Sequence, residues 1–138
     1  MNTTSVINEV VEAVIGLMNG LSLFAPVTRG ALPTGIGITC EVAPSTASEV
    51  YLDKNTYILL DLTINGKHPN LKVLSDAMND LHSALTRMTA YPEDPADPPR
   101  WEITDITNYT LPQIIGREGN NEWLMASSLS VRVYQKGD

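Results

Sequence analysis

The most regular pattern in the chain is the alternation of apolar with small or polar residues over 122–135. Trp123, Met125, Leu129, Val131 and Val133 all occupy odd positions. Successive side chains of a strand point to opposite faces, so these five residues share one face. The pattern predicts that 122–135 is a long strand that ends the domain.

Two earlier segments alternate in the same way. In 35–43 and in 56–65 the apolar residues fall mostly on even positions, which predicts two half-buried strands. The pair Asn65-Gly66 is a frequent turn sequence and sets the expected end of the second strand. We expect the two strands to pair as an antiparallel hairpin with a long mobile tip near 44–55.

Apolar residues at spacings of three and four predict helices over 3–19 and 70–91. The first helix has a wide apolar arc and a narrow polar strip around Glu9 and Glu12. This width fits either deep packing in one domain or a second contact surface. The second helix has one apolar stripe, Asn70 as its N-cap and His82 on its polar side.

The remaining segments complete the predicted fold. Pro92–Pro99 is rich in proline and acidic residues and is expected to be an exposed loop. Residues 101–109 read as a third strand and 111–121 as a long connection. The prediction is one α+β domain over 1–138, in the order α-β-β-α-β-β. It has a four-stranded, mainly antiparallel sheet with both helices on one face, and mobile loops near 44–55, 92–100 and 112–121.

Composition narrows the class of protein. The 138 residues carry 9 basic and 16 acidic side chains, a net charge of -7, which disfavours nucleic-acid binding through counterion release. Cys40 is the one cysteine, so no internal disulfide forms, and its apolar position predicts a buried side chain. We expect neither a signal peptide nor a membrane span, because Glu9 and Glu12 interrupt the apolar N-terminal stretch.

Few residues form a pattern that predicts chemistry. His68 and His82 are far apart and lie at neither metal-ligand nor catalytic-triad spacing. Asp76 and Asp80 share a helix face without an evident third oxygen donor, and the prolines of the acidic loop disfavour a tight cation cage. We therefore predict no catalytic residue, metal or cofactor. An enzyme would need a site assembled from Asp61, His68, His82 or Asp105.

The segment before the last strand differs from the other loops. Over 111–123 it combines exposed-looking apolar residues, such as Leu111, Ile114 and Ile115, with opposite charges and two glycines. It contains the run Gly116-Arg117-Glu118-Gly119-Asn120. Such a segment is either a hairpin tip or a contact surface.

This run, leading into the strand that begins near Trp123, and the order of the elements resemble the small tail-terminator or minor capsid proteins of long-tailed bacteriophages. The resemblance implies a homo-oligomeric ring, usually a hexamer, at the head-proximal end of the tail tube. It implies that the ring stops tube growth and contacts both the tail tube protein and the head connector protein. The implied location is the virion, after assembly in the host bacterial cytoplasm. The family has no catalytic residues to carry over.

If the chain has the role that this resemblance implies, we expect intersubunit or tube contacts in 45–55 and 113–121. The candidate residues are Glu49, Tyr51, Arg117, Glu118, Asn120 and Trp123. The surplus of acidic residues is compatible with a ring bore that does not retain a polyanion. Two alternatives stay open: another head-tail joining protein, of the neck or tail-completion type, and a non-viral small α+β module that binds a ligand.

Overall fold

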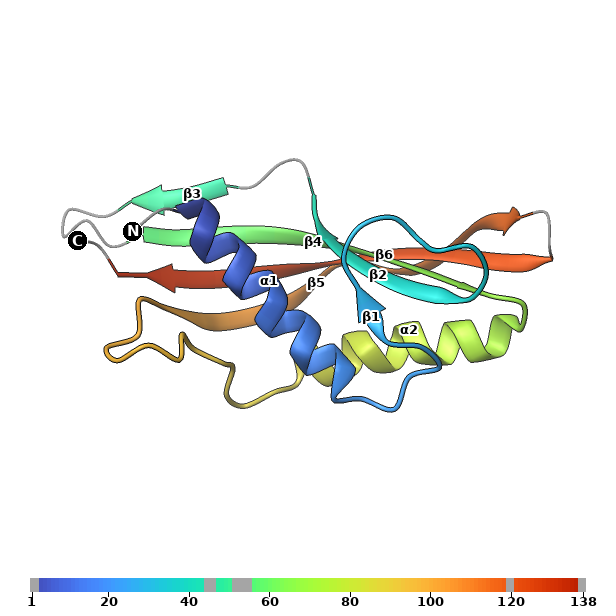
Figure 1. Ribbon diagram of the computed structural model, residues 1–138, viewed down its shortest axis with the longest axis horizontal. Helices are drawn as coiled ribbons and strands as arrows, with labels where there is room; N and C mark the ends of the chain where they lie inside the picture. The colour runs from blue at the N-terminus through green and yellow to red at the C-terminus, as the bar shows by residue number, and fades with distance from the viewer. Residues whose placement is uncertain (1–2, 44–46, 51–55, 119–120, 137–138) are drawn as a thin grey trace.

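The computed structural model describes residues 3–43, 47–50, 56–118 and 121–136. Within these ranges the chain forms two helices and six strands (Figure 1). In chain order they are α1 (Thr3–Asn19), β1 (Val27–Thr28), β2 (Gly37–Val42), β3 (Ala47–Val50), β4 (Thr56–His68), α2 (Leu71–Thr86), β5 (Trp101–Glu118) and β6 (Glu122–Gln135).

The strands form one mixed sheet in the order β1-β2-β4-β6-β5, and β3 also pairs with β4. β1 runs parallel to β2, and all the other pairs are antiparallel. The class is α+β, but the predicted four-stranded sheet and the predicted order α-β-β-α-β-β are wrong. The two extra strands have two and four residues, which is too short for an alternating pattern to reveal them.

β4 continues through the predicted turn at Asn65-Gly66. Gly66 pairs with Ile38 on β2 and with Met125 on β6, so it lies inside the sheet. A Cβ atom at this position would lie 2.8 Å from Leu74 Cδ1 and 3.0 Å from Met78 Sδ. Glycine therefore serves close packing of α2 on β4 rather than a turn. The predicted antiparallel pairing of β2 with β4 is confirmed.

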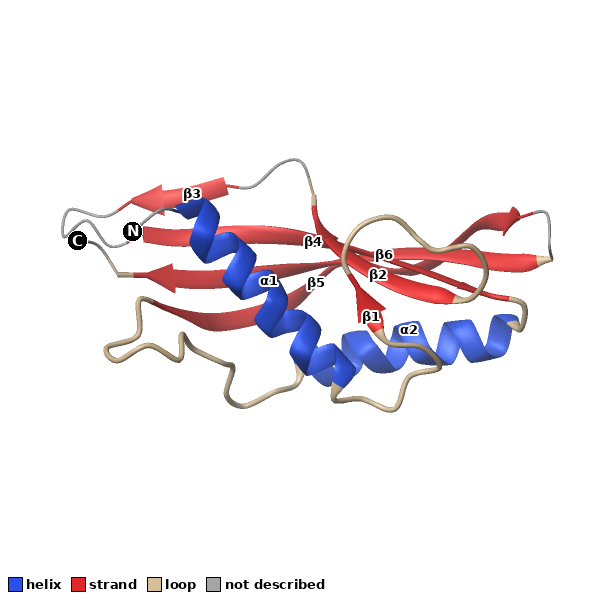
Figure 2. Ribbon diagram, viewed as in Figure 1, coloured by secondary structure: helices blue, strands red, loops and turns tan. Residues whose placement is uncertain are grey.

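The hydrophobic core lies between one face of the sheet and both helices. α1 crosses the strands obliquely, and α2 runs along their length (Figure 2). The even positions of β4 and the odd positions of β6 supply most of the sheet side of this core. Its most deeply buried large side chains include Met18, Ile58, Leu60, Leu62, Ile64, Leu74, Met78, Leu81, Leu85 and Leu129.

Both helices begin where the sequence predicts. The Asn70 side chain caps α2 by accepting hydrogen bonds from the backbone N–H groups of Lys72 and Val73, at 3.0 and 3.2 Å. α2 ends at Thr86, five residues before the predicted end. In the following loop Pro95 and Asp97 are exposed as expected, but Asp94 is buried and anchors the loop to the fold.

The strand predicted over 101–109 extends to Glu118. The predicted connection over 111–121 is therefore wrong for most of its length, because 111–118 belong to β5 and five of these eight residues pair with β6: Gln113, Ile114, Gly116, Arg117 and Glu118. The bounds of β6 agree with the prediction. β5 and β6 together form a long hairpin that reaches one end of the molecule (Figure 1).

Candidate assembly surface

The outer part of the β5–β6 hairpin, residues 109–118 and 121–125, is called the distal hairpin below. It carries four exposed large apolar side chains: Tyr109, Leu111, Ile114 and Ile115. They are 69%, 64%, 51% and 56% exposed, respectively. Among the described residues only two other large apolar side chains are exposed, Ile36 and Val73. The exposed apolar surface of the described chain is therefore concentrated on one strand.

Register shifts between β5 and β6 explain the exposure of three of these residues, Tyr109, Leu111 and Ile115. The pairing steps from Asn108 to Thr110, from Thr110 to Gln113 and from Ile114 to Gly116, so Tyr109, Leu111 and Ile115 have no partner on β6. An unpaired bulge residue is turned away from the regular pleat. The same shifts interrupt the alternation of apolar and polar residues, which is why the sequence pattern does not identify this part of the strand.

β5 is an edge strand of the sheet. The segment before it covers the edge near Trp101, where the Ile103 N–H donates to the Pro92 carbonyl at 3.1 Å and the Asp94 N–H donates to the Trp101 carbonyl at 2.9 Å. Farther along, Pro112 and the bulges make the strand a poor template for addition of another strand. A partner would contact the distal hairpin through side chains rather than through a backbone ladder.

The structure brings together two of the predicted contact residues. Arg117 and Trp123 are directly paired across the hairpin, and the Arg117 guanidinium carbon lies 4.4 Å from the centroid of the Trp123 ring. This cation–π contact orients the exposed arginine at the end of the hairpin. Trp123 is half-buried and packs against the core, so it contributes to the fold as well.

The other predicted contact residues are less fully described. Glu118 ends β5 and pairs with Glu122, and Glu49 lies in β3 opposite Tyr57. The side chains of Glu49 and Glu118 lie outside the described part of the structure, as do residues Tyr51 and Asn120 entirely.

At the base of the distal hairpin a polar network joins the buried side chains of His82 and Ser127 to the exposed side chain of Asn108. The prediction that His82 is on the polar side of its helix is therefore wrong. His82 Nε2 lies 2.6 Å from Ser127 Oγ, and His82 Nδ1 lies 2.8 Å from Asn108 Oδ1. His82 and Ser127 are each 3% exposed. The imidazole thus joins α2 to both β5 and β6. The sequence signal was Ser127 itself, a polar residue on the apolar face of β6.

In an enzyme, a serine, a histidine and an asparagine linked in this way could act as nucleophile, base and orienting group. Here, however, both the hydroxyl and the imidazole are covered by protein. Burial lowers the pKa of His82, and the hydrogen bond to Asn108 opposes this effect. We therefore interpret the network as a clamp that holds α2 against the hairpin.

The other residues considered for an enzyme site do not meet. Asp61 pairs with Ser130, and Asp105 pairs with Arg132, which places both aspartates on the face opposite the helices. His82, in contrast, is buried on the side of the sheet that the helices cover. At the end of β4, His68 Nδ1 accepts a hydrogen bond of 2.9 Å from the Asn70 N–H.

Two further searches cover only the described residues. Within these ranges no three histidine, cysteine, aspartate or glutamate residues are grouped so that they could hold a metal ion. Neither described helix is long and apolar enough to cross a membrane.

Comparison with known proteins does not assign the chain to a family. No family model matches the chain, and a comparison with curated proteins finds no match.

Proposed function

We propose that the protein is a structural virion protein of a tailed phage or prophage that acts as a tail terminator. In this role copies of the chain form a ring, hexameric by the resemblance, at the head-proximal end of the tail tube. The ring stops growth of the tube and provides the surface to which the head connector binds. The observation that carries this proposal is the row of exposed apolar side chains on the distal hairpin.

Exposed apolar side chains gathered along one strand favour a contact surface, because they are stabilised when a partner covers them. A ring needs each copy to contact its neighbours through different surfaces, and a long hairpin that reaches one end of the molecule supplies one of them. The tail tube protein and the head connector protein are the other partners of this role.

The function is tested by electron microscopy of particles made when the gene is disrupted in its source genome. Overlong tails without heads would support the terminator role. Tails of normal length beside separate filled heads would identify a neck or tail-completion protein instead. Intact, infectious particles would refute a role in the virion.

A second test asks whether the distal hairpin mediates assembly. Leu111→Ser and Ile115→Ser should weaken oligomer formation in light scattering while leaving the free energy of unfolding within about 0.5 kcal/mol, as is usual for exposed sites. Gln113→Ser is the matched control, because Gln113 is an exposed polar residue on the same strand. Wild-type assembly of both serine variants would refute this assignment. Trp123→Ala is a poorer test, because Trp123 also packs against the core.

The ligand-binding alternative rests on one observation, a groove of about 530 Å³ between α1 and the loop before β5. Pockets of this size hold small molecules in many proteins. A saturable thermal shift with a small molecule, abolished by filling the groove through Ala13→Trp, would favour this alternative over the virion role.

A further inference from the structure

The groove between α1 and the segment 93–101 has three acidic side chains and one basic side chain in its lining and is called the acidic groove below. Carboxylates of Glu9, Glu12 and Glu93 line it together with the guanidinium of Arg29. Ala13, Pro95 and Trp101 supply its apolar lining. A cavity of about 530 Å³ with such a lining has room for several side chains of a partner.

Ion pairs hold both walls of the acidic groove in place. On one side Arg100 connects the helix to the loop, because its guanidinium lies 2.5 Å from Glu9 Oε1 and also binds the buried carboxylate of Asp94. On the other side Arg29 lies 2.7 Å from Glu41 Oε1 and 3.5 Å from Glu12 Oε1. The groove is therefore formed before any partner arrives.

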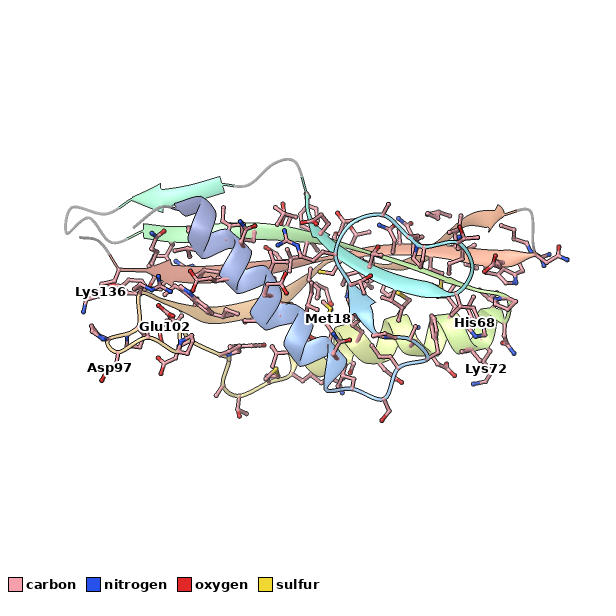
Figure 3. All side chains as sticks on the ribbon, viewed as in Figure 1. Met18, His68, Lys72, Asp97, Glu102 and Lys136 are labelled. Carbon is pink, nitrogen blue, oxygen red and sulfur yellow. The ribbon has the colours of Figure 1, made fainter. Side chains whose placement is uncertain are left out.

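The acidic groove and the distal hairpin lie toward opposite ends of the long axis. Asp97 and Glu102, which flank the groove wall along the chain, lie at one end, and His68 lies near the other end (Figure 3). Trp123 of the distal hairpin pairs with His68. A hairpin therefore cannot reach the groove of its own molecule, so any hairpin that fills the groove belongs to another copy.

We propose that the distal hairpin of one copy docks into the acidic groove of the next copy. Arg117, the exposed cation of the hairpin, faces the carboxylates of Glu12 and Glu93, and Ile115 packs against Ala13 and the neighbouring apolar lining. One surface is a hairpin with an exposed arginine, and the other is a groove lined by three glutamates and one arginine. Because the two surfaces are different, the contact is head-to-tail and generates a ring when its rotation closes. This inference rests on the proposed function, because it names the surfaces that join the subunits of the ring.

Cysteine cross-linking tests the contact in the full chain. The variants are Ile115→Cys on the hairpin, Ala13→Cys in the groove, and the double variant, each treated with a mild oxidant at pH 8. The native thiol does not interfere, since Cys40 is fully buried and burial raises its pKa to about 12. The expected result is cross-linked dimers from an equal mixture of the single variants and a ladder from the double variant. The highest band of that ladder gives the number of subunits in the ring.

The outcomes separate this inference from the proposed function. Cross-linked dimers from Ile115→Cys alone would mean that hairpins meet one another, and would overturn the head-to-tail contact. Wild-type oligomers without any cross-link in the mixture would overturn the docking site while leaving the ring in place. A monomer under all conditions, together with intact particles after gene disruption, would overturn the proposed function itself.

A charge exchange gives an independent reading. Arg117→Glu should abolish the ladder, and combining it with Glu93→Lys should restore at least half of the cross-linked product. Asp97→Lys is the matched control, because Asp97 is an exposed acid of the same loop that does not line the groove. Rescue by the control to the same degree would show that only net charge matters, and would overturn the pairing of Arg117 with the groove.

Discussion

The buried clamp at the base of the distal hairpin makes a sharp prediction for Ser127→Ala. The change removes the hydroxyl that lies 2.6 Å from His82 Nε2 and leaves that ring nitrogen without its partner. Both side chains are 3% exposed, so bulk water does not replace the lost hydrogen bond. A buried polar group left unpaired costs about 1–3 kcal/mol, and we expect the free energy of unfolding to fall by this amount.

Urea unfolding followed by tryptophan fluorescence measures this loss, because Trp101 and Trp123 lie on the two strands that the clamp holds. Ser128→Ala is the matched control, since Ser128 is the next residue on β6, is half-buried and points to the opposite face. The control should change stability by less than about 0.5 kcal/mol. Equal effects of the two substitutions would refute the clamp.

The clamp also predicts how stability depends on pH. Burial lowers the pKa of His82 in the folded protein, so folding favours the neutral imidazole. This contribution is fully present above the unfolded pKa of about 6.5 and is lost as the pH falls through the lower folded pKa. Wild-type protein should lose stability between pH 7 and pH 5 faster than His82→Gln does. Parallel curves for the two proteins would contradict this assignment.

Three further predictions concern the rest of the fold. Gly66→Ala should lower the free energy of unfolding by about 1–3 kcal/mol in urea titrations, because the new methyl group meets Leu74 and Met78. Shortening Met78 to alanine in the same protein should recover part of this loss. Asp94→Asn should lower the urea midpoint at pH 7 more than Asp97→Asn does. Hydrogen bonds from Arg100 hold the pKa of Asp94 well below its usual value, so this difference should start to shrink as the pH falls below the unfolded pKa of about 4 and should be lost only as the pH falls through the lowered folded pKa. Cys40 should resist a thiol reagent at pH 8 in the folded protein and react fully in urea, as absorbance of the released chromophore would measure.

Regular elements could be predicted from the sequence where one physical pattern acts alone. β6 alternates along its length because one face is buried and the other is open, and both of its bounds were predicted. The start of α2 was predicted because Asn70 is a strong cap. At these positions local sequence and tertiary packing agree.

Prediction failed where tertiary contacts override local signals. Asn65-Gly66 is a turn sequence in isolation, but here the glycine gives α2 room to pack against β4. His82 was assigned to a polar helix face because its partners, Asn108 and Ser127, are 26 and 45 residues away in the chain. No local pattern can reveal such pairs.

The candidate assembly surface was predicted only in part. Arg117 and Trp123 were named from the sequence, and the structure joins them in one cation–π contact. The apolar residues after Leu111 were noted from the sequence, but they were assigned to a loop rather than to β5. The bulges that turn Tyr109, Leu111 and Ile115 outward also remove the alternation by which a strand is recognised. The bulges that expose these side chains are therefore also the reason why the sequence pattern does not reveal the strand.

β5 changes its role at Asn108. Before this residue the apolar side chains of Trp101, Ile103 and Ile106 are buried in the core, and Asn108 itself joins the clamp. From Tyr109 onward the bulges turn apolar side chains outward. Substitutions at Asn108 should therefore change folding stability, whereas substitutions at Leu111 and Ile115 should change only contacts with partners. The first part of the strand would then determine folding stability, and the second part would determine contacts with partners. In the proposed role, the chain would fold as a monomer and its distal hairpin would stay exposed until another copy covers it.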